Sequence, residues 1–267
     1  MNIGIAGYGF VGRALHRLLG RNPDHAVTVY DKYVGEHSGV AALERLNRCD
    51  LVFVAVPTPF DEAQGSCDLS NVREIVARVN VPMCIKSTVP PGTVDALIAE
   101  TGKAIAFSPE YIGERPGHPW GEADSAGFVI CGGDPVACRL VRAAHAGVSA
   151  LPLTFAEPSA TAAELTKYME NAFLAMKVVF ANQFFDLAQA AGVDFTELRT
   201  LFLLDHRIGS SHTEVFAERG FGGKCLPKDL HAIVAWARGR ADASFLEDIL
   251  AYNEDLRSRA AAALVPS

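Results

Sequence analysis

The sequence predicts an α/β protein in which a doubly wound parallel sheet precedes an all-helical region with one long central helix. In the first half of the 267 residues, short β-type segments alternate with helical segments, as in parallel sheets with crossover helices. Residues 51–56 are apolar throughout, which is typical of a strand buried on both faces. Residues 159–191 contain neither glycine nor proline, so one helix can run through them without interruption.

The individual elements follow from local patterns. Short apolar runs between turn residues predict strands over residues 3–6, 27–30, 51–56, 81–86, 104–107 and 127–131. Helices are predicted over residues 11–19, 159–191, 195–204, 229–238 and 245–263. The long helix has the capping-box pair Thr161 and Glu164 at its start and Gly192 at its end. We therefore place a domain boundary near Pro158, with domains over residues 1–156 and 157–267.

Composition excludes several classes of protein. Hydrophobic residues make up 49% and charged residues 21%, as in ordinary globular proteins, and the net charge of −7 disfavours nucleic acid and anionic membranes as partners. No apolar run approaches the roughly 20 residues that span a bilayer, and the N-terminus lacks the basic region of a signal peptide. The six cysteines form no C-x-x-C pair, and the histidines show no metal-binding spacing. We expect a cytoplasmic protein with reduced thiols and no metal.

A glycine motif opens the chain. Gly7, Gly9 and Gly12 fit G-x-G-x-x-G between a predicted strand and a predicted helix, the context in which this motif binds a dinucleotide pyrophosphate. Asp31 ends the second predicted strand, where a carboxylate binds the ribose 2′-hydroxyl and favours NAD over NADP. Lys32 follows directly and weakens that preference. The motif predicts a Rossmann-type domain, and the alternative is a glycine-rich turn in an unrelated α/β protein.

One segment predicts thiol chemistry. Cys225 follows Gly222, Gly223 and Lys224 and lies near Lys228 and a predicted helix start, an environment that lowers a thiol pKa. Glycines there bring the backbone close to another group, for which phosphate is one candidate. The alternative is a buried cysteine that acts as a small hydrophobic residue.

Other polar residues lie on the long helix and in loops after strands. Glu164, Lys167 and Asn171 share one helix face, and the alternative is a solvated polar stripe. Two loops follow predicted strands, where open α/β sheets place ligand contacts: residues 86–93 and 108–114. The alternative for both is a simple connecting loop. Residues 56–59 form a rigid turn after the third predicted strand.

Taken in order, these segments resemble the UDP-glucose/GDP-mannose dehydrogenase family over nearly the whole chain. The resemblance rests on residues 7–12, 56–59, 87–93, 109–114, 164–171, 205–209 and 220–229. It implies NAD-dependent oxidation of the primary alcohol of a nucleotide sugar to a carboxylate, through an aldehyde and a cysteine thioester. It also implies a homodimer formed along the long helix.

The resemblance implies a role for each matching residue. Cys225 is the nucleophile, Asp229 and Thr88 order a catalytic water, and Lys167 and Asn171 stabilise the oxyanion. Glu110 is the general base for thioester hydrolysis, Glu114 is a second acid–base candidate, and Arg207 reaches the sugar in the neighbouring subunit. The expected cofactor contacts are Gly7, Gly9, Phe10, Val11, Gly12, Asp31, Lys32, Val56, Pro57, Thr58, Thr88 and Glu114. The expected substrate contacts are Glu110, Lys167, Asn171, Arg207, Phe221, Gly222, Gly223 and Lys224.

The sequence also departs from the family pattern. Typical members continue into a second nucleotide-binding domain at about the position of Ser267, and their segment after Asp31 is longer. Lys224 stands where a small or aromatic residue is usual, and Leu226 replaces a common phenylalanine. Three alternatives therefore stay open: the same oxidation of a smaller alcohol such as a nucleoside or sugar phosphate, an NAD-binding subunit that needs a partner chain, and a two-electron β-hydroxyacid dehydrogenase.

Overall fold

The computed structural model describes residues 1–112, 127–149 and 152–263, which form two compact units. The first unit contains residues 1–61 and 67–167, and the second contains residues 62–66 and 168–267. The long helix passes through both units, since their division falls between Lys167 and Tyr168. The boundary that we place near Pro158 stays a prediction.

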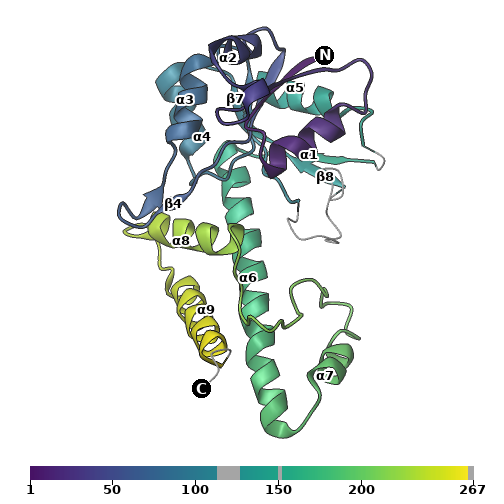
Figure 1. Ribbon diagram of the computed structural model, residues 1–267, viewed down its shortest axis with the longest axis vertical. Helices are drawn as coiled ribbons and strands as arrows, with labels where there is room; N and C mark the ends of the chain where they lie inside the picture. Colours follow the sequence, from purple (N-terminus) through teal and green to yellow (C-terminus); the bar gives the residue numbers. More distant parts are fainter. Residues whose placement is uncertain (113–126, 150–151, 264–267) are drawn as a thin grey trace. The chain divides into compact units, whose positions relative to one another are not determined.

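The first unit is built on a six-stranded sheet with the order β2-β1-β3-β6-β7-β9 (Figure 1). Its strands are β1 (Asn2–Ala6), β2 (Ala26–Tyr30), β3 (Leu51–Val54), β6 (Met83–Ile85), β7 (Ile105–Phe107) and β9 (Gly132–Gly133). All neighbouring pairs are parallel except β7 with β9. The chain first moves outward to β2 and then returns past β1 to β3. The predicted doubly wound parallel sheet is confirmed.

Helices cover both faces of this sheet because its strands are apolar on both sides. Within β3, Val52 and Val54 pack into one cluster with α2 (Val40–Leu46), α3 (Ser70–Arg78) and α4 (Thr93–Thr101). Leu51 and Phe53 face the opposite cluster, with α1 (Phe10–Leu19) and α5 (Pro135–His145). All four β3 residues are buried, as their continuous apolar pattern predicts.

The last part of the sheet differs from the prediction for residues 127–131. There β8 (Phe128–Ile130) pairs with β10 (Thr154–Ala156) in a separate two-stranded parallel sheet, and β9 takes the edge position beside β7. Glycine explains this edge: a Cβ on Gly133, whose φ is +127°, would lie 2.7 Å from the carbonyl oxygen of Ile105. Only a residue without a side chain can approach β7 so closely. The short β4 (Phe60–Asp61) and β5 (Ser66–Cys67) pair with each other.

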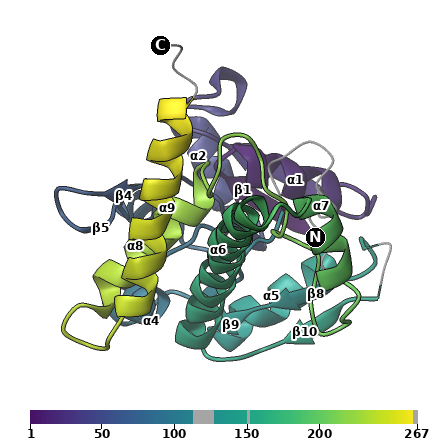
Figure 2. The ribbon, with the colours of Figure 1, turned by 90° about the horizontal axis from the view of Figure 1, so that it is seen from below.

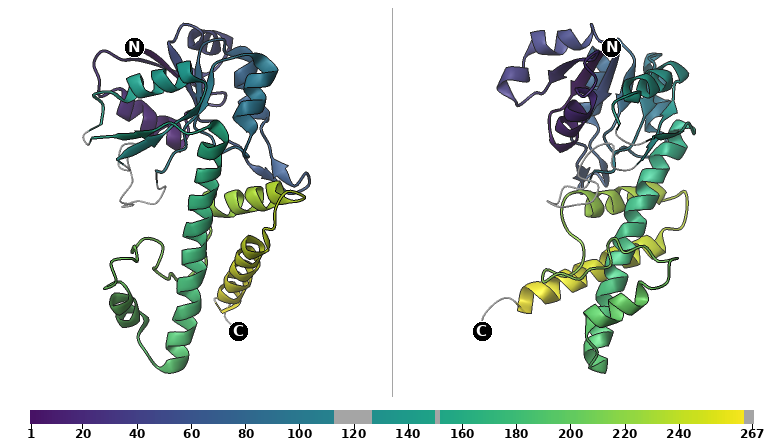
Figure 3. Two further views of the ribbon diagram at one scale, coloured as in Figure 1. Left: turned by 180° about the vertical axis from the view of Figure 1, so that it is seen from behind. Right: turned by 90° about the vertical axis from the view of Figure 1, so that its right-hand side faces the viewer.

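The second unit is helical. Its part of α6 (Ala160–Ala191) packs with α8 (Cys225–Ala237) and α9 (Ser244–Ala263) around Ala175, Leu230 and Ile249 (Figure 2). After Gly192, α7 (Phe195–Phe202) turns back so that Phe195 packs edge-on against Phe185 of α6 (Figure 3). The predicted long helix is confirmed, and α8 begins at Cys225, four residues before its predicted start. Within the described residues, no helix combines the length and the apolar character needed to cross a membrane.

A buried carboxylate joins α6 to the N-terminus of α4 within the first unit. Glu164 has no solvent exposure, and its two carboxylate oxygens accept hydrogen bonds from Gly92 N at 2.6 Å and Val94 N at 2.9 Å. Both N–H groups belong to the first turn of α4 or its cap, where no preceding helical carbonyl is available to accept a hydrogen bond from them. The solvated stripe considered for Glu164 is therefore wrong, because this residue is part of the core.

This clamp predicts a pH-dependent stability. Burial raises the pKa of the Glu164 carboxyl to about 7, whereas a glutamate in an unfolded chain titrates near 4.3. The folded protein then binds the proton more tightly, so this contribution is complete below about pH 4 and is lost as the pH rises towards 7. It amounts to roughly 4 kcal/mol at most. Urea denaturation at pH 5 and pH 8 measures most of this contribution.

The matched control is Glu164→Gln, which cannot titrate at this position. We expect the variant to be less stable at pH 5, because the amide NH2 cannot accept a hydrogen bond, whereas both oxygens of the protonated carboxyl keep acceptor capacity. Its unfolding free energy should also change less than that of the native protein between the two pH values. Equal changes in both proteins would contradict the assignment to Glu164.

Candidate active site

The glycine motif forms a close turn between β1 and α1. Gly7 has a φ of +96°, and a Cβ there would lie 2.4 Å from the carbonyl oxygen of Ala55. A Cβ on Gly12 would lie 2.0 Å from the oxygen of Gly7. Gly9, which caps α1, has no atom within 4 Å of its Cβ position. Two glycines thus permit the packing, and the third leaves the helix N-terminus accessible, so the turn fits a dinucleotide pyrophosphate.

Asp31 lies beside this turn. One carboxylate oxygen accepts from Tyr8 N at 2.6 Å, and the other accepts from Tyr33 N at 2.8 Å and Val34 N at 3.2 Å. These bonds fix the carboxylate and leave acceptor capacity for a ribose hydroxyl, since two carboxylate oxygens offer about four lone-pair sites. Lys32 donates to Glu74 at 3.1 Å, so its charge is paired with another carboxylate. The residues present fit NAD at this position. Phe10 and Val11 form the first turn of α1.

Two further loops of the first unit meet at the carboxyl ends of β3 and β6. Thr58 donates from its hydroxyl to the oxygen of Thr88 at 2.7 Å, and Ser87 donates to the oxygen of Val56 at 2.6 Å. The structure therefore joins the predicted segments that contain Val56, Pro57, Thr58 and Thr88. Thr58 is buried, whereas Thr88 is half-buried. This is the edge of the sheet at which open α/β folds bind their ligands.

A buried ion pair near the predicted Glu110 was not recognised in the sequence. Lys86 follows β6, and its ammonium lies 3.3 Å from Glu110 Oε2, with side-chain exposures of 4% and 11%. Lys86 also donates to Pro109 O at 3.0 Å and Ser108 Oγ at 3.4 Å. Glu110 Oε1 accepts from Tyr111 N at 2.9 Å. The sequence signal for this pair is the position of Lys86 directly after a buried strand. A buried ammonium there requires a carboxylate or other acceptor as its partner.

Lys167 of α6 also lies next to this loop. Its ammonium is 4.9 Å from the ring centroid of Tyr111, a cation–π contact within the first unit. Two of the predicted catalytic residues, Lys167 and Glu110, therefore both contact Tyr111. Glu114 lies outside the described residues.

In the second unit, Cys225 is the first residue of α8 and is exposed, whereas the other five cysteines are buried. The alternative of a buried hydrophobic cysteine is therefore wrong for this residue. Its backbone position at a helix N-terminus, directly after Lys224, is one that favours the thiolate.

Asp229 lies one turn after Cys225 and is 1% exposed. One oxygen accepts from Asn171 Nδ2 of α6 at 2.5 Å, and the other forms an ion pair with Lys228. The structure thereby brings together two predicted catalytic residues that are 58 positions apart. Asn171 is buried as well, so the solvated stripe does not apply to it.

The remaining predicted site residues of the second unit differ in their burial. Phe221 is buried in the core, while Gly223 and Lys224 are exposed before α8. The groups closest to Gly220 and Gly222 are side chains of α9. The Arg207 side chain is 89% exposed and forms a bidentate ion pair with Asp205. Among the described residues, this pair does not connect Arg207 to the other predicted site residues.

The Lys86–Glu110 pair predicts a characteristic stability pattern. Lys86→Met leaves a buried carboxylate without its cation and should lower the unfolding free energy by about 3–5 kcal/mol. Glu110→Met should have a similar effect for the converse reason. The double variant removes both charges and should recover much of the loss, a coupling that denaturant titration of all four proteins measures. Losses that simply add in the double variant would show that the two charges do not interact.

Comparisons with known proteins agree with this arrangement. Residues 38–145 match the NAD binding domain and residues 161–255 match the central domain of the UDP-glucose/GDP-mannose dehydrogenase family. UDP-glucose 6-dehydrogenase of Rhizobium meliloti (strain 1021) is 34% identical over 230 residues, which are 79% of this chain and 51% of the relative. The chain thus spans about half the length of the curated relatives that it matches.

Solved structures show the same fold. A UDP-glucose dehydrogenase from the hyperthermophilic archaeon Pyrobaculum islandicum superposes with a TM-score of 0.80 at 26% identity, covering 95% of this chain and 68% of that one. Mycobacterium tuberculosis 3-hydroxyisobutyrate dehydrogenase gives a TM-score of 0.68 at 19% identity, with coverages of 98% and 94%, which concerns the fold alone. With the predicted NAD-binding domain confirmed by the family match, the chain belongs to the UDP-glucose/GDP-mannose dehydrogenase family.

Proposed function

We propose that this chain carries out the NAD-dependent oxidation of the primary alcohol of a nucleotide sugar, of the UDP-glucose type, to a carboxylate. The observation that carries the proposal is Cys225, exposed at the start of α8 with the Asp229–Asn171 pair one turn away. A thiol is needed for a four-electron oxidation through a thioester and has no use in a simple alcohol dehydrogenase. The curated relatives are UDP-glucose 6-dehydrogenases, which supports this substrate class.

The first oxidation converts the alcohol to an aldehyde and releases one proton. NAD, when bound, accepts the hydride. Lys167 supplies a positive charge and Asn171 a hydrogen-bond donor for the oxyanion that develops as the hydroxyl loses its proton. Gly9 and Asp31 would hold the cofactor through its pyrophosphate and ribose.

The second oxidation uses the thiol. The Cys225 sulfur would add to the aldehyde carbon and form a thiohemiacetal, and loss of a second hydride, which a second NAD would accept in place of the first, would give the thioester. Water then attacks the carbonyl, with Glu110 accepting its proton, and the carbon–sulfur bond breaks to release the acid and restore the thiol. Thr88 and Asp229 order this water, and Glu114 is a second acid–base candidate. The ion pair with Lys86 holds the Glu110 carboxylate in place.

The proposal predicts two NADH per substrate consumed. Purified protein with NAD and a panel of UDP-, GDP- and dTDP-sugars, nucleosides and sugar phosphates should give this ratio on a sugar nucleotide. Cys225→Ser should form no acid and release at most one NADH, because an alkoxide cannot replace the thiolate. Cys49→Ser, which changes a buried thiol of the first unit, is the control and should keep the ratio.

Other outcomes select among the alternatives. A ratio of two on a nucleoside or sugar phosphate would keep the chemistry and replace the substrate. A ratio of one that Cys225→Ser leaves unchanged would favour the β-hydroxyacid dehydrogenase type and overturn the thioester mechanism. Retained NAD binding without turnover of any compound would favour a subunit that needs a partner chain.

We further propose a homodimer formed along α6, with Arg207 contributing to the partner subunit's sugar site. In the second unit, α6 exposes large apolar side chains at spacings of four, seven, four and three residues, which places them in one stripe. They are Met169, Phe173, Phe180, Phe184 and Leu187, with exposures of 41–75%. Water contact of so many apolar groups on one helix face is typical of an interface. All six cysteines are in the reduced form, which supports a cytoplasmic location.

Charge on this stripe should dissociate the dimer. Phe173→Glu and Phe184→Glu each place a carboxylate among apolar groups, and we expect a monomer by light scattering coupled to size-exclusion chromatography. Phe245→Glu is the matched control, because Phe245 is equally apolar and 60% exposed but lies on α9. A monomeric native protein, or a dimer that survives both stripe variants, would contradict an interface on α6.

A further inference from the structure

The loop that leads into Cys225 is held by two buried asparagines from different helices. Asn253 of α9 accepts from Phe221 N at 2.6 Å and donates to Phe221 O at 3.0 Å, so one amide satisfies both backbone groups of one residue. On the other side, Asn182 of α6 accepts from Gly220 N at 3.3 Å and from Arg219 Nε at 2.7 Å. Asn253 is 5% exposed and Asn182 is 1% exposed. Buried amides with both ends bonded hold a backbone segment in one position.

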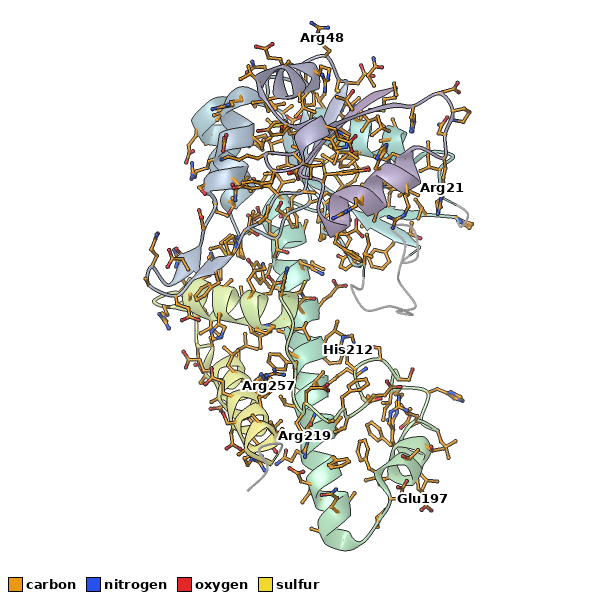
Figure 4. The ribbon with its side chains drawn as sticks, in the orientation of Figure 1. Arg21, Arg48, Glu197, His212, Arg219 and Arg257 are labelled. Carbon is orange, nitrogen blue, oxygen red and sulfur yellow. The ribbon has the colours of Figure 1, made fainter. Side chains whose placement is uncertain are left out.

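The two glycines that flank Phe221 make this contact possible. Gly220 has a φ of +58°, and a Cβ there would lie 2.4 Å from Asn253 Oδ1. A Cβ on Gly222 would lie 2.8 Å from Nη1 of Arg257, which is one turn further along α9. Figure 4 shows Arg219 and Arg257 in the region between α6 and α9. These glycines therefore serve the close approach of α9 side chains to the loop.

The held residue is close to the thiol in the chain. Phe221 is 3% exposed and belongs to the core of the second unit. The residues between it and Cys225 include Gly222 and Gly223, and Gly223 has a φ of +77°. Only residues 222–224 separate Phe221 from Cys225, and so short a segment limits how far the first residue of α8 can lie from the anchor at Phe221.

We propose that Asn253 is a positioning residue for Cys225, acting through the backbone of Phe221. The inference rests on the proposed function in one respect, the role of Cys225 as nucleophile. Asn253 itself contacts neither substrate nor cofactor in this scheme. A nucleophile displaced by about 1 Å loses about 100-fold in rate, so the clamp affects the chemical step more than the binding of substrate.

Two variants of Asn253 test the proposal. Asn253→Ala removes both hydrogen bonds to Phe221, whereas Asn253→Asp keeps an oxygen for the Phe221 N–H and loses the donor to the Phe221 carbonyl. We expect kcat to fall about 10- to 100-fold in Asn253→Ala, with KM for NAD unchanged and a smaller loss in Asn253→Asp. Leu250→Ala, a buried α9 residue outside the clamp, is the control for lost stability and should keep kcat.

A second readout needs no substrate. Iodoacetamide should alkylate exposed Cys225 far faster than the five buried cysteines, and Cys225→Ser supplies the blank. Because a thiol leaves the stabilising helix N-terminus when its loop loosens, alkylation at pH 7 should slow about threefold or more in Asn253→Ala. If Asn253→Ala does not fold, the same slowing in Asn253→Asp carries the test.

The two readouts separate the two proposals. Slower alkylation in a protein that oxidises none of the substrates would support the positioning role and overturn the proposed function. Native kcat and native alkylation in folded Asn253 variants of an active enzyme would overturn the positioning role alone. The same loss of kcat in Leu250→Ala would also overturn it, because the effect would then follow stability.

Discussion

The contact of Gly7 with the carbonyl of Ala55 is the constraint on which the first unit's site depends. No side chain fits between these backbones, so β1 and β3 end together and the Gly7–Gly12 turn lies directly beside the loop after β3. That loop is in turn bonded to the one after β6 through Thr58 and Ser87. Lys86 then connects β6 to Glu110 after β7. Each loop is thus placed by its neighbour, and a change in one displaces the next.

In the second unit, buried side chains hold the loop before Cys225 in place, as strand ends hold the loops of the first unit. Its loops have no sheet to join them, so buried amides from α6 and α9 bond the backbone before Cys225. The Asn171–Asp229 pair likewise fixes α8 against α6. In both units glycine supplies the space, since Gly7 admits a carbonyl and Gly220 admits an amide. Such glycines are easily recognised in the sequence, but the sequence does not show which group packs against each of them.

The predictions succeeded where the signal was local. Alternating elements, the Gly7–Gly12 turn and the uninterrupted long helix are all readable within short windows, and the structure has them. The pairs that complete the site are distant in the chain: Lys86 with Glu110, Asn171 with Asp229, and Phe221 with Asn253. Such partners depend on how helices and strands pack, which periodicity does not specify. The edge strand β9 was missed for a related reason, because two glycines carry no β-type pattern.

Cationic side chains lie at the candidate site of a chain whose net charge is negative. The net charge of −7 argues against polyanions as general partners. Yet lysines occur at the functional loops of both units: Lys86 and Lys167 near Glu110, and Lys224 and Lys228 around Cys225. Lys86 and Lys228 each form an ion pair with a carboxylate, and the ammonium of Lys167 lies over the Tyr111 ring. Under the proposed function, these local cations, and not the net charge of the protein, would attract the compact diphosphate of a nucleotide sugar.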